Sequence, residues 1–353
     1  MGTVTGARPR ARETGATRPG GGTRLGALDL GTNNCRLLVA APQGDAFRVV
    51  DSFSRIVRLG EGLAATDRLS DAAMQRTLAA LRVCAQVMER HRVSHARCVA
   101  TEACRRAANG PEFMERARRA TGIELELLDQ EDEARLAMLG CLPLVEPEAD
   151  QVVMVDIGGG STEVMWLDRW AAPAARIGHA VSLPLGVVTL SESLGQDGGA
   201  AGYAAMVDHV HERLLAAGAA LPASKRVSGR RLQMIGTSGT VTTLAAVHLG
   251  LHRYDRRKVD GVRLGFAAVD AVAATLRELS NAERAAHPCI GVGRADLVVA
   301  GCAILDAVHR LWPVEELRVA DRGLREGILA ELMGHSLSEA LLPPAALPAD
   351  AAE

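Results

Sequence analysis

The architecture of this chain follows from one segment, Val152-Val153-Met154-Val155-Asp156-Ile157-Gly158-Gly159-Gly160-Ser161-Thr162-Glu163. Its first four residues are apolar and mostly β-branched, which predicts a buried strand. A carboxylate, three glycines, two hydroxyls and a second carboxylate follow. Consecutive backbone N–H groups in such a glycine turn bind anions. A glycine turn alone also fits an ordinary hairpin, but this order of residue types favours a phosphate-binding turn, with Asp156 placed to hold a metal ion or an attacking water.

The same arrangement occurs earlier in the chain. Residues 26–40 predict a strand, a polar turn and a second strand, with Asp29 at the end of the first strand. Taken alone, the segment Gly31-Thr32-Asn33-Asn34 would be an ordinary hairpin turn. Because strand, Asp, aliphatic residue, Gly and polar turn occur twice, we predict two related α/β domains whose turns face each other across a ligand-binding cleft.

Length and composition restrict the class of protein. A chain of 353 residues suggests roughly two domains, and 48% hydrophobic but only 3% aromatic residues suit an α/β core built from Ala, Leu and Val. No apolar run reaches the roughly 18–20 residues of a membrane span, so we expect no membrane association. Residues 1–24 are rich in Gly, Thr and Arg and lack the apolar core of a secretory signal. They predict a disordered basic tail, with an electrostatic tether for a polyanion as the alternative.

Cysteine and charge content point to a compartment and exclude one class of partner. The 7 cysteines are scattered and contain no CxxC pair, which favours reduced thiols and a cytoplasmic protein. A formal net charge of −2 excludes a globally basic nucleic-acid binder, so we expect no DNA partner.

Acidic residues are concentrated at the start of a predicted helix, in the run Asp129-Gln130-Glu131-Asp132-Glu133. The helix dipole favours an acid in the first turn by about 0.3–1 kcal/mol. One acid would satisfy that preference, whereas four place strong negative charge near an expected phosphate site. We therefore predict that one of them is a base or binds a divalent cation that bridges to phosphate.

Basic residues occur at two places where a phosphate ligand is expected. Arg105 and Arg106 follow the short predicted strand 98–102, and residues after a strand face the ligand crevice of an α/β sheet. A solvated salt-bridging surface is the alternative, and it is stronger for Arg106. A third glycine turn, at residues 236–240, joins a strand to a helix N-terminus and predicts another anion site. The cations after it are predicted to form a polyanion-binding patch or, alternatively, a solvated loop: Arg253, Arg256, Arg257 and Lys258.

From about Leu25 to Leu332 the chain resembles the exopolyphosphatase/guanosine pentaphosphate phosphatase (Ppx/GppA) family of the actin, Hsp70 and sugar kinase superfamily. The motifs that carry the resemblance are Asp29-Leu30-Gly31-Thr32-Asn33-Asn34-Cys35-Arg36-Leu37, Val57-Arg58-Leu59-Gly60-Glu61-Gly62-Leu63, Ala100-Thr101-Glu102-Ala103-Cys104-Arg105, Glu133-Ala134-Arg135, Asp156-Ile157-Gly158-Gly159-Gly160-Ser161-Thr162-Glu163, Ser182-Leu183-Pro184-Leu185-Gly186, Gly236-Thr237-Ser238-Gly239-Thr240 and Gly323-Leu324-Arg325-Glu326-Gly327. The chain looks like the short, two-domain form of this family.

The resemblance implies a fold and a domain division. The expected fold is α/β, with two related actin-like (ribonuclease H-like) domains whose mixed sheets face each other across an interdomain cleft. We expect the N-terminal domain at 25–136 and the C-terminal domain at 137–335. Its last helix, at about 323–335, is expected to pack back on the first domain, and residues 336–353 to form a flexible tail.

The resemblance also implies roles for individual residues. The family's essential glutamate falls on Glu133, expected to be the base that activates water, and its essential aspartate falls on Asp156. Asp156 and Glu163 are expected to act in catalysis by holding Mg²⁺, or another divalent cation, or the water. The expected phosphate-binding residues are Asp29, Gly31, Thr32, Asn33, Asn34, Arg36, Arg105, Gly158, Gly159, Gly160, Ser161, Thr162, Gly236, Thr237, Ser238, Gly239 and Thr240.

The expected reaction is metal-dependent hydrolysis of the terminal phosphoanhydride of inorganic polyphosphate, which releases orthophosphate. Conversion of guanosine pentaphosphate (pppGpp) to ppGpp, as in the stringent response, is the alternative within the same class, because both substrates present a terminal phosphate on a polyanion. An ATP-dependent kinase of the superfamily and a non-catalytic polyphosphate or nucleotide sensor are more distant alternatives. A homodimer is expected by family analogy alone.

Overall fold

The computed structural model describes residues 22–171, 177–194, 199–219 and 231–337. The predicted terminal tails, 1–24 and 336–353, lie outside this part of the chain except for residues 22–24 and 336–337.

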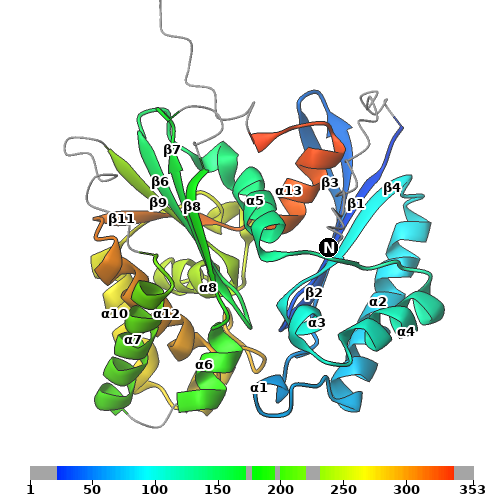
Figure 1. The fold of residues 1–353 in the computed structure, drawn as a ribbon. Coiled ribbons are helices and arrows are strands. Elements are labelled where there is room, and N and C mark those ends of the chain that lie inside the picture. The colour runs from blue at the N-terminus through cyan, green and yellow to red at the C-terminus, as the bar shows by residue number, and fades with distance from the viewer. Residues whose placement is uncertain (1–21, 172–176, 195–198, 220–230, 338–353) are drawn as a thin grey trace, which may run out of the picture.

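The described chain forms two mixed β-sheets that lie side by side, each with its own helices (Figure 1). The first sheet has the order β3-β2-β1-β4-β5 and contains β1 (Leu25–Leu30), β2 (Asn34–Gln43), β3 (Ala46–Ile56), β4 (His95–Ala100) and β5 (Glu126–Leu127). The second sheet has the order β10-β11-β9-β6-β7-β8 and contains β6 (Gln151–Ile157), β7 (Thr162–Asp168), β8 (Ile177–Leu183), β9 (Leu232–Thr237), β10 (Arg263–Gly265) and β11 (Glu316–Ala320).

The two sheets share one topology. In each, a central strand, β1 or β6, pairs antiparallel with the next strand of the chain and parallel with a later one, β4 or β9. The order β3-β2-β1-β4-β5 of the first sheet therefore repeats as β8-β7-β6-β9-β11 in the second, which has β10 as an additional edge strand. The predicted α/β fold with mixed sheets is confirmed, and the repeat inferred from two short turns extends to whole sheets.

Helices connect the strands and cover the sheets. They are α1 (Leu63–Thr66), α2 (Asp71–Arg90), α3 (Glu102–Arg106), α4 (Gly110–Thr121), α5 (Gln130–Cys141), the 3₁₀ helix η1 (Leu142–Leu144), α6 (Val187–Leu194), α7 (Gly199–Ala216), α8 (Ser238–His248), α9 (Arg256–Val259), α10 (Phe266–Glu278), α11 (Asn281–Ala286), α12 (Val298–Leu311) and α13 (Leu324–Leu332). Local signals explain several of their ends: the Ser70 hydroxyl accepts from the N–H of Ala73 at the start of α2, and Gly122, with φ of 73°, ends α4. None of the described helices combines the length and apolarity of a membrane span.

One predicted strand is much shorter than expected. From the sequence, residues 123–128 are expected to form a short strand, but only Glu126 and Leu127 pair with β4. Ile123 and Leu125 are buried in the core of the first half instead. Because β5 lies at the edge of its sheet, it can form backbone hydrogen bonds with one neighbouring strand only. Packing of its side chains against the core therefore determines the path of residues 123–128.

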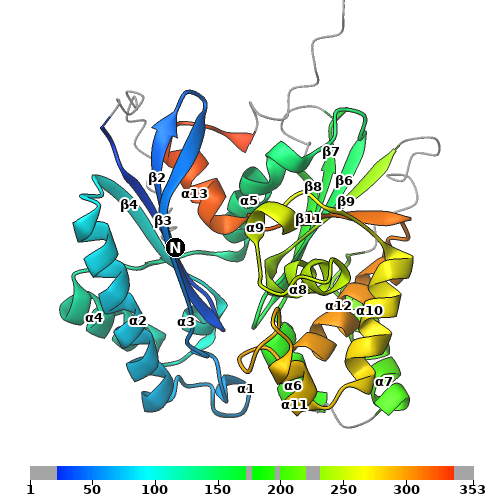
Figure 2. The same cartoon turned by 180° about the vertical axis from the view of Figure 1, so that it is seen from behind.

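The chain crosses between the two halves twice, and each crossing helix packs on the sheet of the other half. Helix α5 follows the first sheet in sequence, yet its Ala137 and Met138 pack with Met154 of the second sheet. Helix α13 follows the second sheet, yet its Ile328 packs with Ala27 of the first. The two helices lie against each other between the sheets (Figures 1 and 2).

Glycines allow α5 and α13 to approach closely. A Cβ atom on Gly140 of α5 would lie 2.8 Å from the backbone nitrogen of Gly327 of α13, and one on Gly327 would overlap the carbonyl oxygen of Leu136. On another part of the interface, the Arg58 guanidinium donates to the Asp296 carboxylate at 2.9 Å. The two halves are thus joined both through backbone contact and through an ion pair.

The Gly327→Ala variant is expected to lose about 1–3 kcal/mol of unfolding free energy, because the added methyl group overlaps the backbone of α5. Urea unfolding measures this loss. The matched control is Gly202→Ala, a helical position in α7 with no atom within 4 Å of the added Cβ, where a small gain of about 0.5–1 kcal/mol is expected. Equal stability of wild type and Gly327→Ala would contradict the packing described for α5 and α13.

Candidate active site

A cavity of about 430 Å³ lies between the two halves, at the carboxyl ends of β1, β6, β9 and β11. This volume is within the roughly 300–1,000 Å³ typical of ligand sites. Its lining includes these residues expected from the sequence: Asp29, Gly31, Thr32, Asn33, Asn34, Arg36, Glu133, Asp156, Gly158, Gly159, Gly160, Ser161, Thr237 and Ser238. Six of the expected catalytic and phosphate-binding residues do not line it: Arg105, Thr162, Glu163, Gly236, Gly239 and Thr240.

The two repeated turns have the same geometry and touch each other. In the first, the N–H of Gly31 donates to the carbonyl of Asn34 at 2.9 Å, and in the second the N–H of Gly158 donates to that of Ser161, also at 2.9 Å. A Cβ atom on Gly160 would lie 2.6 Å from the Thr32 hydroxyl. From the sequence, we explained the glycines of this turn by the close approach of a phosphate group. The structure adds a second reason, because the other turn also approaches Gly160 closely.

Four acidic side chains from four elements, β1, α5, β6 and β7, form what we call the carboxylate cluster: Asp29, Glu133, Asp156 and Glu163. Asp156 and Glu163 are directly opposite each other on β6 and β7, so their side chains lie on the same face of the sheet. Glu163 is 3% exposed and accepts a hydrogen bond from the Ser182 hydroxyl at 2.8 Å. It therefore lies behind Asp156 rather than in the cavity wall.

Burial raises the pKa of every member of this cluster. Burial is the main cause of a pKa of about 6 for Asp156, which nearby Arg36 partly offsets. Burial, and then the Asp156 carboxylate, raise the pKa of Glu163 to about 7. Burial and the Glu163 carboxylate hold the pKa of Glu133 well above its ordinary value, and burial raises the pKa of Asp29. The folded protein therefore disfavours the ionised form of these carboxyls, and a bound cation would favour it.

Arg105 holds the predicted base in position. Its guanidinium lies 3.2 Å from Glu133 Oε2 and 2.7 Å from Glu102 Oε2, and it also donates to the backbone carbonyl of Leu128. Because Arg105 uses its donors on these groups, it contacts the cavity only through Glu133. The sequence placed it with the phosphate ligands, whereas its contacts are those of a residue that orients a carboxylate.

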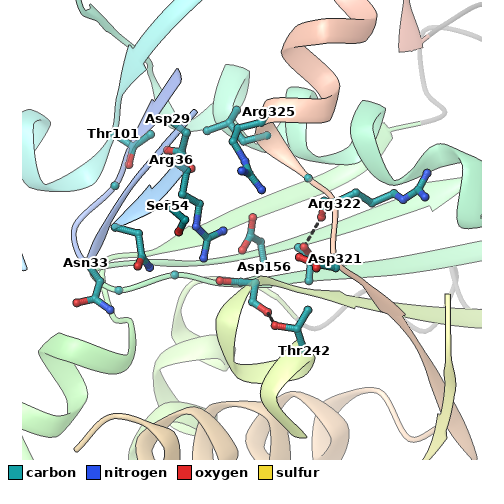
Figure 3. Close-up of a pocket in the computed structure, with 18 of the residues that line it drawn as sticks. Asp29, Asn33, Arg36, Ser54, Thr101, Asp156, Thr242, Asp321, Arg322 and Arg325 are labelled. Carbon is teal, nitrogen blue, oxygen red and sulfur yellow. Dashed lines mark hydrogen bonds between the residues drawn. The ribbon is translucent and has the colours of Figure 1, made fainter. Parts of the chain in front are cut away.

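Three arginines at the cavity lack the carboxylate partner that most other described arginines have. We call Arg36, Arg294 and Arg325 the unpaired arginines, because none of them forms an ion pair within the described residues. The Arg36 and Arg325 side chains extend into the space around Asp156 (Figure 3). Burial lowers the pKa of Arg325 and of Arg294, so the folded protein disfavours these charges until an anion compensates them.

Sequence reasoning missed Arg294, Arg325, Asp321 and Tyr254, all of which line the cavity. Asp321 directly follows β11, so it repeats the strand-then-acid pattern of Asp29 and Asp156, and this signal could have found it. Its pKa is raised by burial, and it accepts a hydrogen bond from the Tyr254 hydroxyl at 2.6 Å. Arg294 lies in a loop before α12 with no motif around it.

The predicted polyanion patch is divided by the structure. Arg256 lines the cavity and forms an ion pair of 2.6 Å with Glu326. Arg253, Arg257 and Lys258 are exposed and lie outside the cavity. Arg322, which also lines the cavity, extends away from the other labelled side chains (Figure 3) and pairs with Asp260.

The carboxylate cluster suits a hard divalent cation. Among the described residues, no three His, Cys, Asp or Glu side chains form a complete metal site. Mg²⁺ does not require one, because it keeps several waters and is bound by one or two carboxylates together with substrate phosphates. Asp156, which lines the cavity, and Glu163 directly behind it have the carboxylate oxygen atoms that such an ion prefers.

Comparison with known proteins gives the family. A sequence profile of the Ppx/GppA phosphatase family matches residues 38–336. Exopolyphosphatase 2 of Mycobacterium tuberculosis is 29% identical over 327 residues, which cover 88% of this chain and 99% of that protein.

Solved structures agree with this assignment. A crystal structure of an exopolyphosphatase-like protein has a TM-score of 0.79 and 31% identity, covering 88% of this chain and 97% of that one. A Ppx/GppA family member from Aquifex aeolicus has a TM-score of 0.71 and 29% identity, with coverage of 88% and 97%. The profile, the relative and the structures each span most of the chain. The predicted relationship is confirmed, and this chain belongs to the Ppx/GppA phosphatase family, whose members are hydrolases.

Proposed function

We propose that this chain is an exopolyphosphatase, which hydrolyses the terminal phosphoanhydride bond of inorganic polyphosphate and releases orthophosphate. The observation that supports this most is the charge of the cavity, where the carboxylate cluster and the unpaired arginines meet. Phosphoryl transfer needs an oriented water, a base and donors for the phosphate oxygens, and very little covalent chemistry from the protein. The similarity to exopolyphosphatase 2 of Mycobacterium tuberculosis supports the same substrate.

The terminal phosphoryl group would lie in the cavity against the two repeated turns, whose N–H and hydroxyl groups would donate to its oxygens. Glu133, unprotonated, would accept a proton from water while the water oxygen bonds to phosphorus. The bond from phosphorus to the bridging oxygen breaks, and the shortened chain leaves with that oxygen. Arg105 positions Glu133, and burial, which raises the pKa of Glu133, makes it a stronger base than an exposed glutamate.

The remaining donors compensate the charge of the substrate. Arg36 and Arg325 extend into the cavity and would bind oxygens of the terminal and following phosphates (Figure 3). Asp156 and Glu163 would hold Mg²⁺, which when bound would neutralise charge on the carboxylate cluster and on the phosphate oxygens.

The lining of the cavity favours polyphosphate over pppGpp. Recognition of a guanine base calls for aromatic or apolar surface as well as polar groups. Among the described residues of the lining, Tyr254 is the one aromatic side chain, and its hydroxyl is bonded to Asp321. The presence of Glu133 and Asp156 in the cavity supports an enzyme over a sensor or a kinase. A cytoplasmic location and a homodimer remain predictions.

The Glu133→Gln variant is expected to reduce kcat for phosphate release from long-chain polyphosphate by about 10²–10⁴, since the water loses its base. The assay measures phosphate released by wild type and variant with Mg²⁺ and with a chelator, from long-chain polyphosphate, tripolyphosphate, pppGpp and ATP. Chelator is expected to abolish wild-type activity.

The control for this variant is Glu131→Gln, an exposed acid in the same first turn of α5, which should leave the rate unchanged. Wild-type rates for Glu133→Gln would show that Glu133 is not the base. Release of phosphate from pppGpp alone would show that the proposed substrate is wrong.

The Arg325→Met variant is expected to raise KM for polyphosphate roughly tenfold without loss of stability. Burial lowers the pKa of Arg325, which means that the folded protein without substrate disfavours its charge, and Met removes that cost at similar volume. Steady-state kinetics measure the expected rise in KM, and urea unfolding tests whether stability is unchanged. Arg118→Met, at an exposed arginine paired with Glu115 on α4, is the control for KM. An unchanged KM for Arg325→Met would remove Arg325 from the binding site.

Stability of the metal-free protein is expected to fall as pH rises from about 4 to 7. The carboxyls of Asp156 and Glu163 titrate near pH 6 and 7 in the folded state but near pH 4 when unfolded, so the folded state binds more protons in this window. The contribution of these two carboxyls to the free energy of unfolding is fully present below about pH 4 and is lost as the pH rises through about 7.

The Glu163→Gln variant should therefore be more stable than wild type at pH 8 by on the order of 2 kcal/mol, with the difference shrinking toward pH 5. Urea unfolding in the presence of EDTA at several pH values measures this difference. A difference that does not depend on pH would contradict the raised pKa of Glu163.

A further inference from the structure

The segment from His252 to Lys258 has an inner side and an outer side. On the inner side, Tyr254 and Arg256 line the cavity and bind Asp321 and Glu326. Figure 2 shows α9, which contains Arg256, between the two halves of the molecule. This segment therefore forms part of the wall of the active site.

The outer side forms a second concavity, of about 620 Å³, and Tyr254 lines both spaces. Three exposed cations line it, Arg253, Arg257 and Lys258, against one carboxylate, Asp255. Asp255 pairs with Arg257 at 3.3 Å, but the Arg257 side chain remains 90% exposed. Within the described residues, neither Arg253 nor Lys258 forms an ion pair. The concavity thus has a positive excess that the described fold does not neutralise.

We propose that this outer concavity is a second polyanion subsite, which binds phosphate units of the chain that extend out of the cavity past Tyr254. The inference rests on the proposed function, because it requires a substrate longer than the cavity. A linear polyphosphate carries charge along its whole length, and surface cations that follow such a chain add affinity through release of its counterions. Tyr254 is the point of continuity, since no other residue lines both spaces among those described.

The subsite would make affinity depend on chain length and leave the chemical step unchanged. Arg253, Arg257 and Lys258 do not line the cavity that contains Glu133, so they cannot act on the terminal phosphoryl group. Binding energy from remote units that is equal in the ground and transition states changes KM and leaves kcat as it was. A substrate short enough to stay in the cavity would not respond to these cations.

The test is the triple variant Arg253→Gln, Arg257→Gln, Lys258→Gln, assayed with Mg²⁺ on long-chain polyphosphate and on tripolyphosphate. The expected result is a KM for the long chain that rises roughly tenfold, with kcat unchanged and with KM for tripolyphosphate within about twofold of wild type. The slope of log KM against log salt for the long chain should also become shallower, by about 0.7 for each cation that contacts the chain. In a second comparison, Lys258→Glu should raise KM for the long chain more than Lys258→Gln does.

The matched control removes three exposed arginines from α4, Arg116, Arg118 and Arg119, and should leave both KM values unchanged. An unchanged KM for the long chain in the first triple variant would overturn the subsite, and so would an equal rise for both substrates. Failure of the proposed function gives a different result, because wild type would then release no phosphate from either polyphosphate.

Discussion

The backbone contact between α5 and α13 holds the two halves of this protein in one arrangement, and the cavity depends on that arrangement. Gly140 and Gly327 permit the contact, because any larger side chain at either position would overlap the backbone of the other helix. Each helix also packs on the sheet of the other half. A movement of one half relative to the other would therefore displace α5 or α13, and with it the site residues on that helix. Glu133 is on the first turn of α5 and Arg325 on the first turn of α13. Both residues line the cavity, so the contact between α5 and α13 fixes their positions in it.

In and directly behind the cavity wall, the protein buries ionisable groups of both signs whose charged forms it disfavours. Burial raises the pKa of the carboxylate cluster and lowers the pKa of Arg294 and Arg325, so each group would be more favourable in water. A structure selected for stability alone would pair or remove such groups. The ligands that we propose, a cation for the acids and a phosphate chain for the arginines, would compensate them. The concavity beyond Tyr254 adds a further group of positive charges at the surface.

Much of the site could be predicted because it lies where local sequence defines position. Asp29 and Asp156 end the central strands of their sheets, and the turns after them have the same hydrogen bonds, as their similar sequences suggested. Glu133 is in the first turn of α5, and the acidic run predicted the N-terminus of this helix. Local sequence could not show that Arg105 contacts Glu133 rather than phosphate, since the two residues are 28 positions apart and meet only in the folded chain.

By itself, the sequence determined the two repeated α/β units, the turns at their central strands and the family to which the chain belongs. These depend on hydrophobic periodicity and on glycines and acids at fixed short spacings, which act locally. Tertiary structure alone decided that Arg294 and Asp321 line the cavity, that Glu163 lies behind Asp156, and that Arg256 separates from its basic neighbours. The reason is that burial and ion pairing depend on contacts between segments that are distant in sequence. No local sequence pattern predicts which side chains will be buried together in a low-dielectric environment.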